Sequence, residues 1–132
     1  MRVVIDTNIF VSSFFGGYPK EIIDLWKKEK ITLCLSKDIL DEYIEVLQRI
    51  GLQDKEELNK LLSVFAKGFN MVFTTKTPKI RIVKDPDDDK FIECAIALNA
   101  NVIITGDKLL IGVGEYMGIK ILTANQFLKT GI

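Results

Sequence analysis

The chain has 132 residues, of which 48% are hydrophobic and 27% charged, and this indicates one globular domain with a core that needs no metal or disulfide support. Eighteen basic and eighteen acidic residues give a net charge of zero, which excludes a globally basic nucleic-acid binder. The absence of histidine excludes Ser-His-Asp and Cys-His catalysis and His-ligated zinc. Any chemistry therefore depends on carboxylates, lysines, hydroxyls or an oxygen-bound metal.

The cysteines and the first residues favour a cytoplasmic protein. Cys34 and Cys94 stand singly in apolar surroundings, without the spacing of a zinc or redox site, so we expect buried, reduced thiols. The chain leads from Met1 directly into an apolar strand and shows no signal-peptide pattern. Since no apolar run is long enough to cross a bilayer, we expect no membrane contact.

Apolar runs alternate with helical patterns along the chain. Residues 3–5 are a short β-branched run, typical of a strand buried on both faces of a parallel sheet. Further strands are expected at 31–35, 102–105 and 119–122, and helices from about Pro19 to Lys30, at 37–50 between Ser36 and Gly51, at 54–68 from Asp54, at 91–99, and after Thr123. The stretch 69–84 fits two short strands or an extended loop, because Pro78 interrupts it. This order predicts an α/β fold, a three-layer α/β/α sandwich around a central, mainly parallel sheet.

Two acidic residues follow buried strands directly. Asp6 comes after strand 3–5, and Asp107 comes just after strand 102–105. Sheets of this kind bind ligands at the carboxyl ends of their strands, so both residues are candidates for a site. Each has an alternative role, which is to cap the helix that follows it.

The helix predicted at 37–50 contributes a third candidate. Glu42 lies about 115° from the centre of the apolar face and flanks it, whereas Asp38, Asp41 and Glu45 point to solvent. Glu42 is therefore the acid that this helix turns toward the sheet edge. Its alternative role is a boundary carboxylate paired with a nearby lysine.

A fourth candidate precedes the helix at 91–99. A helical wheel centred on the apolar residues of this helix places Asp88 near the centre of the inward face, whereas Asp89 and Glu93 point away from that face. We expect Asp89 to face outward and to serve the helix terminus. Capping alone would explain one or two of these aspartates. Together with the other three acids, Asp88 forms a group of like charges that a cation must offset, and oxygen ligands favour Mg²⁺ or Mn²⁺.

Several ordered motifs resemble the PIN-domain ribonucleases, and most closely their toxin-like (VapC-type) branch. They are Asp6-Thr7-Asn8 after the first strand, the helix with Glu42, Asp-Pro-Asp-Asp-Asp-Lys-Phe at 85–91, Ile-Thr-Gly-Asp-Lys-Leu-Leu at 104–110 and Leu-Thr-Ala-Asn-Gln-Phe at 122–127. The resemblance covers the whole chain and so implies a single PIN-like domain over residues 1–132.

The resemblance implies an endoribonuclease that hydrolyses RNA phosphodiester bonds with Mg²⁺ or Mn²⁺, often dimeric, and in toxin members neutralised by a cognate antitoxin. By position, the catalytic and metal-binding acids carry over to Asp6, Glu42, Asp88 and Asp107. Asn8 and Thr105 carry over as supporting groups near the metal.

One of these assignments has an alternative. Counting back from Asp107 by the commoner family spacing gives Asp89, while the helix pattern through Phe91 and Ala95 gives Asp88. We favour Asp88, because loop length before a strand varies more easily than the inward orientation of a helix residue.

The RNA backbone requires local positive charge, and one stretch supplies it. Lys76, Lys79, Arg81 and Lys84 are a candidate contact for phosphates, with a charged, solvated edge strand as the alternative.

Other classes of protein fit less well. A receiver-like phosphoacceptor domain requires adjacent acids after the first strand, and a haloacid-dehalogenase-type phosphatase requires a second Asp at position 8, where this chain has Asn8. The remaining alternative is a PIN-like domain without catalytic activity that serves as a binding or assembly module.

Overall fold

The structure is a computed structural model that describes residues 1–50 and 55–131. Gly51 and Asp54, expected to end one helix and begin the next, lie outside the described residues. The described strands are β1 (Arg2–Ile5), β2 (Thr32–Ser36), β3 (Met71–Thr74), β4 (Val102–Ile104), β5 (Glu115–Tyr116) and β6 (Ile119–Leu122). The helices are α1 (Thr7–Ser12), α2 (Gly17–Lys27), α3 (Lys37–Arg49), α4 (Lys55–Ala66), α5 (Asp89–Ala97), α6 (Lys108–Val113) and α7 (Ala124–Leu128), with short 3₁₀ helices η1 (Ser13–Phe15) and η2 (Pro86–Asp88).

The strands form one sheet in the order β3-β2-β1-β4-β6-β5, in which every neighbouring pair is parallel except β5 and β6. The first strand is central, with β2 on one side and β4 on the other. Ile5 lies beside Ile104 in register, so the residues that follow β1 and β4 leave the same edge of the sheet together. This pairing brings the segments that carry Asp6 and Asp107 side by side.

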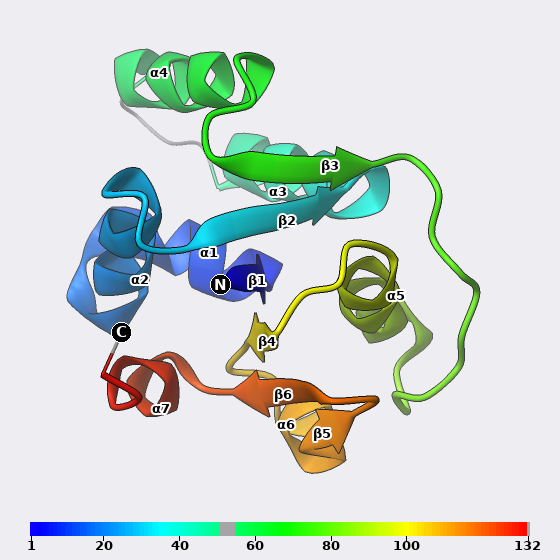
Figure 1. Cartoon of the computed structure of the whole chain (residues 1–132). Coiled ribbons are helices and arrows are strands. Elements are labelled where there is room, and N and C mark those ends of the chain that lie inside the picture. The colour runs from blue at the N-terminus through cyan, green and yellow to red at the C-terminus, as the bar shows by residue number, and fades with distance from the viewer. Residues whose placement is uncertain (51–54, 132) are drawn as a thin grey trace.

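Helices cover both faces of this sheet (Figure 1). One face is packed by α5, which contacts β1, β2 and β4, and α1, α2 and α7 lie on the opposite side. The third helix, α3, packs on α1 and reaches α5 near the carboxyl ends of the strands. The predicted three-layer α/β/α arrangement with a mainly parallel sheet is confirmed.

An aromatic cluster fixes α3 relative to the central strand. The rings of Phe10 and Tyr43 are stacked with their centroids 4.1 Å apart, and both side chains are fully buried or nearly so. The Tyr43 hydroxyl donates a hydrogen bond to the carbonyl oxygen of Ile5 at the end of β1. Buried aromatic pairs of this kind stabilise a core beyond their area alone, and here they set the position of α3. Glu42, the residue before Tyr43, is thereby placed beside the end of β1.

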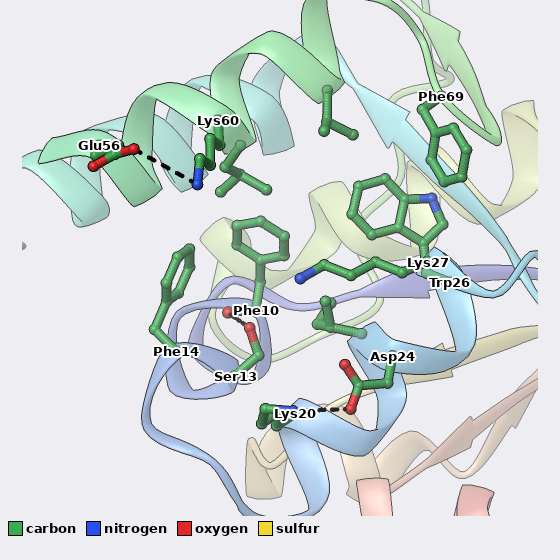
Figure 2. A pocket seen from close by; sticks show the side chains of 13 residues that line it. Phe10, Ser13, Phe14, Lys20, Asp24, Trp26, Lys27, Glu56, Lys60 and Phe69 are labelled. Atoms are coloured by element: carbon green, nitrogen blue, oxygen red, sulfur yellow. Dashed lines mark hydrogen bonds and ion pairs between the residues drawn. The ribbon is translucent and has the colours of Figure 1, made fainter. Parts of the chain in front are cut away.

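The same aromatic cluster borders a hollow of about 610 Å³ between α1, α2 and α4 (Figure 2). Phe10, Trp26 and Phe69 contribute to its apolar wall, and the Lys20–Asp24 ion pair lies at its rim.

The structure confirms the predicted strands at 3–5, 31–35, 102–105 and 119–122 to within one residue at each end. Ser36 caps α3 through its hydroxyl, and Thr123 forms a capping box with Gln126 at the start of α7. The stretch 69–84 contains one short strand, β3, followed by an extended segment. The helices α1 and α6 were not predicted, although the capping role considered for Asp6 and Asp107 implied them.

Both cysteines are buried and unpaired, as expected. Burial raises the pKa of Cys34 to about 11 and that of Cys94 to about 12, so both thiols stay protonated and unreactive near neutral pH. In the part of the chain that the structure describes, no helix is long and apolar enough to cross a membrane.

Candidate active site

Asp6 is held in place at the end of β1 by two hydrogen bonds. Its Oδ1 accepts from the backbone N–H of Ile9 at 2.8 Å, which makes Asp6 the N-cap of α1, and its Oδ2 accepts from the Thr105 hydroxyl. Asp6 is 4% exposed, and burial is the main cause that raises the pKa of its carboxyl group. The capping role is therefore real, and it leaves the carboxyl at the edge of the sheet with a fixed orientation.

Asp107 occupies the matching position after β4. Its Oδ1 caps α6 by accepting from the N–H of Leu109 at 2.7 Å, and its own N–H donates to the Thr105 hydroxyl at 3.0 Å. Thr105 is fully buried and so links Asp6 to Asp107 from beneath the site. Asn8 is exposed and lies at the rim of the same cavity.

Asp88 faces these two acids from the end of η2. Its Oδ2 is buried and, among the described residues, is the one buried side-chain oxygen or nitrogen without a hydrogen-bond partner. Burial raises the pKa of Asp88 to about 6, and repulsion from Asp107, Asp85 and Asp6 adds to this effect. An unpartnered oxygen among mutually repelling carboxylates is the environment that a bound cation would relieve.

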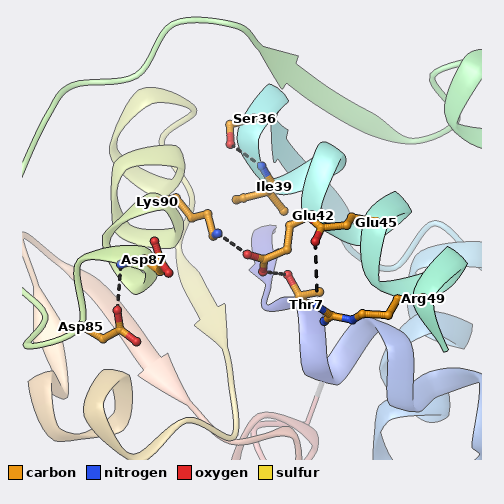
Figure 3. Close-up of polar contacts among 9 residues, drawn as sticks. All are labelled: Thr7, Ser36, Ile39, Glu42, Glu45, Arg49, Asp85, Asp87 and Lys90. Carbon is orange, nitrogen blue, oxygen red and sulfur yellow. Dashed lines mark hydrogen bonds and ion pairs between the residues drawn. The ribbon is translucent and has the colours of Figure 1, made fainter.

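Glu42 reaches the site from α3 and is bound on both sides (Figure 3). The Thr7 hydroxyl donates to its Oε1, and the Lys90 ammonium donates to its Oε2. The pairing with a lysine, considered as the alternative role of Glu42, is therefore present in the structure. The residue also lines the site cavity, so the two roles do not exclude each other.

The prediction that Asp89 faces outward was wrong, and Glu93, which was expected to point away from the inward face, is also buried. The two residues are 3% and 7% exposed. Asp89 Oδ1 accepts from the N–H groups of Ile82 and Val83 at 3.0 and 2.8 Å, and Glu93 Oε2 accepts from the N–H of Ile80 at 2.9 Å. The helical wheel considered only which side of α5 faces the sheet. The extended segment after β3 covers a second side of the helix, so residues there are buried as well. Both acids therefore hold this segment against the helix.

The four predicted acids line one cavity of about 410 Å³ at the carboxyl edge of the sheet. They are Asp6, Glu42, Asp88 and Asp107. As the side chains stand in residues 1–50 and 55–131, no group of three acids or cysteines is arranged to hold a metal ion. The donor chemistry nevertheless fits a hard divalent cation, because the ligands are all oxygen and Asp88 Oδ2 has no partner.

Two basic residues of the extended segment lie beside this cavity. Lys76, Lys79, Arg81 and Lys84 are all exposed. Lys79 and Arg81 line a neighbouring hollow that shares Glu42 and Lys90 with the site cavity. The segment is therefore placed where it could contact a substrate that extends out of the site.

Comparisons with known proteins agree with the fold and the sequence motifs. Residues 2–109 match the family model described as PIN domain, so the chain belongs to the PIN-domain family, as the motifs predicted. Its fold is similar to a chain in the crystal structure of VapBC2 from Rickettsia felis bound to a DNA fragment from their promoter, with 17% identity and a TM-score of 0.57 over 92% of this chain and 97% of that chain. No curated protein sequence matches this chain significantly.

Proposed function

We propose that this PIN domain is an endoribonuclease that hydrolyses RNA phosphodiester bonds with the help of Mg²⁺ or Mn²⁺. The observation that carries the proposal is the gathering of four acids from four separated segments around one cavity, with a buried Asp88 oxygen that has no partner. An acidic site of this kind costs stability in the absence of a cation, which argues for a functional reason to keep it.

In this proposal Asp6, Asp88 and Asp107 hold the ion. Capping bonds fix the first and third carboxyl groups, so their remaining oxygen atoms are held at the edge of the sheet. When bound, such an ion lowers the pKa of a water molecule and offsets the charge that develops on the phosphate. Glu42 completes the acidic set, either by orienting the attacking water or by contributing to a second ion, and Thr105 keeps Asp6 and Asp107 in their relative positions.

The RNA would follow the exposed surface beside the cavity. Lys79 and Arg81 lie next to the site and can contact phosphates, while Asn8 offers amide hydrogen bonds at the rim. Phosphate contacts of this type position a strand without reading its sequence.

We also propose that the protein is the toxin of a toxin-antitoxin pair. The support is the resemblance to the toxin-like branch together with the fold shared with a chain of the VapBC2 structure. A cognate antitoxin and a homodimer are the partners that this proposal predicts. The competing function is a PIN-like binding or assembly module without catalysis.

The test is cleavage of single-stranded RNA by purified protein with Mn²⁺, with Mg²⁺, and with EDTA. Asp6→Asn keeps the capping oxygen but loses the charge, so we expect cleavage to fall by at least about 100-fold, because even groups that only orient metal ligands cost about 10- to 100-fold when changed. Asp38→Asn removes an exposed acid from the same region of the surface and serves as the control, with activity unchanged. RNA that stays intact with the wild type and Mn²⁺ would favour the non-catalytic module.

A further inference from the structure

Among the described residues, Glu42 differs from the other three acids of the site because it alone forms an ion pair with a basic residue. Thr7 from α1 donates to one oxygen and Lys90 from α5 donates to the other (Figure 3). These two contacts join α3, which carries Glu42, to α1 and to α5, across 35 and 48 positions of the sequence. Asp88, in contrast, has a buried oxygen without a hydrogen-bond partner among the described residues.

The Lys90–Glu42 ion pair also differs from the other ion pairs of the described residues. The others join residues four positions apart on one helix and lie at the exposed surface. The Lys90 and Glu42 side chains are only 19% and 29% exposed, and they join α5 to α3 at the wall of the cavity. A partly buried pair is screened less by water and salt, so Lys90 offsets the Glu42 charge more effectively than an exposed lysine would.

We propose that Lys90 is the resident cation of this site: its ammonium group occupies the position beside Glu42 that a second divalent ion would otherwise take. The site then binds one ion, through Asp6, Asp88 and Asp107. This inference rests on the proposed function, since it assumes that the cavity binds a divalent cation at all.

Two physical reasons support a single ion. A divalent ion placed beside Glu42 would stand next to the positive Lys90 group and be repelled by it. The Glu42 charge is also already offset by that ammonium group, so a second cation would gain less there than beside an unpaired carboxylate. The uncompensated negative charge lies on the other side of the cavity, where repulsion from Asp107 and Asp6 acts on Asp88. Lys90 is therefore a positioning residue that holds Glu42 and sets the number of ions.

The experiment counts bound Mn²⁺ ions per chain by calorimetric titration of metal-free protein, which requires no RNA and no activity. We expect one ion in the wild type and two in Lys90→Met, since methionine keeps the apolar stem and removes the charge. The double variant Lys90→Met with Glu42→Gln should return to one ion, because the second position then lacks its carboxylate. Lys108→Met is the matched control: it removes an equal charge from an exposed residue next to Asp107 and should still bind one ion.

A purely structural ion pair would give a different result. In that case Lys90→Met would lower the melting temperature of metal-free protein by several degrees and leave the ion count at one, which would overturn the proposal. Lys90→Gln, which keeps a hydrogen-bond donor without the charge, repeats the count should the methionine variant unfold.

Two other outcomes also decide the matter. Two ions in the wild type would overturn the resident-cation proposal while leaving the metal-dependent nuclease in place. No Mn²⁺ binding by the wild type would overturn both, and the two failures are thereby distinguished.

Discussion

Asp88 and Asp89 are adjacent in the sequence, yet their carboxyl groups lie in opposite environments. Asp89 is almost fully buried and accepts two backbone hydrogen bonds from the extended segment after β3. Asp88 is half-buried, faces Asp107 and Asp6, and has an oxygen without a partner. Burial alone therefore does not describe how the two acids differ. The difference is whether the chain supplies the hydrogen-bond donors that each carboxylate needs.

The acids on the two sides of the start of α5 differ in the same way. One side turns an unsatisfied acid toward the carboxyl edge of the sheet, and the other uses Asp89 and Glu93 to fix the segment that carries Lys79 and Arg81. The helix start thus joins the acidic cavity to the basic segment beside it. Changes to the two kinds of acid should consequently affect different properties of the protein.

The largest expected effect is on catalysis by Asp88→Asn. The amide keeps the shape of the side chain but loses the charge that a metal ligand needs, so RNA cleavage should fall by orders of magnitude with little change in stability. Asp89→Asn should retain most of the activity, since its oxygen can still accept from Ile82 and Val83. The measurement is the initial cleavage rate of each variant at saturating Mn²⁺. The reverse pattern would show that the spacing argument for Asp89 was right.

The next effect is on stability. Asp89→Ala leaves one buried and one part-buried N–H group without an acceptor, and this should lower the free energy of unfolding by about 3 kcal/mol, since each unsatisfied buried group costs about 1–3 kcal/mol. Urea unfolding of metal-free protein measures it. Asp88→Ala is the comparison and should be neutral or stabilising, because it removes a repelled carboxylate. Equal losses in the two variants would remove the distinction between the acids.

Metal binding should stabilise the folded chain by about as much as Asp89→Ala destabilises it, or by less. A ligand that binds only the folded state at 100 times its Kd adds about 2.7 kcal/mol, so Mn²⁺ should raise the melting temperature of the wild type. Asp107→Asn should lose most of that gain, whereas Asp38→Asn should keep it. A thermal shift that is the same in all three proteins would exclude Asp107 as a ligand.

The smallest effect concerns pH in the absence of metal. The pKa of Asp88 is raised to about 6 in the folded chain, so as the pH falls through 6 the folded state takes up a proton that the unfolded state does not yet bind. Protonation of Asp88 therefore adds stability as the pH falls from about 7 to 5, and this contribution disappears as the pH rises through 6. The melting temperature of the wild type minus that of Asp88→Asn, measured in EDTA, should therefore increase as the pH is lowered from about 7 to 5. A flat difference would show that Asp88 is not strained by its neighbours.

The sequence predicted the parts of this structure that follow from local patterns. The buried β-branched strands, the capping residues Ser36 and Thr123, and the placement of Asp6 and Asp107 at one sheet edge all follow from periodicity and from the rules of parallel sheets. The helices α1 and α6 were missed because each is only six residues long and too short for a clear apolar period. Their signal was the capping aspartate that precedes each of them.

The contacts around α5 could not be predicted, because they depend on a segment whose path the sequence leaves ambiguous. Asp89 was expected to face outward, and it is buried because residues 80–83 cross that flank of the helix. Pairing with a lysine was the alternative role considered for Glu42, but the sequence could not indicate which lysine, because Lys90 is 48 positions away and belongs to another helix. Helical wheels describe one element against one surface, and so they miss a second covering segment.

A crystal structure of the protein with Mn²⁺, in which anomalous scattering locates the ion, tests the role of Asp88 most directly. We expect one peak in the cavity, bound by Asp88 together with Asp6 and Asp107 through carboxylate oxygens at about 2.0–2.3 Å. Asp89 should remain bound to the N–H groups of Ile82 and Val83. A peak coordinated by Asp89, or a saturated crystal with no peak near Asp88, would show that Asp88 is not the metal ligand.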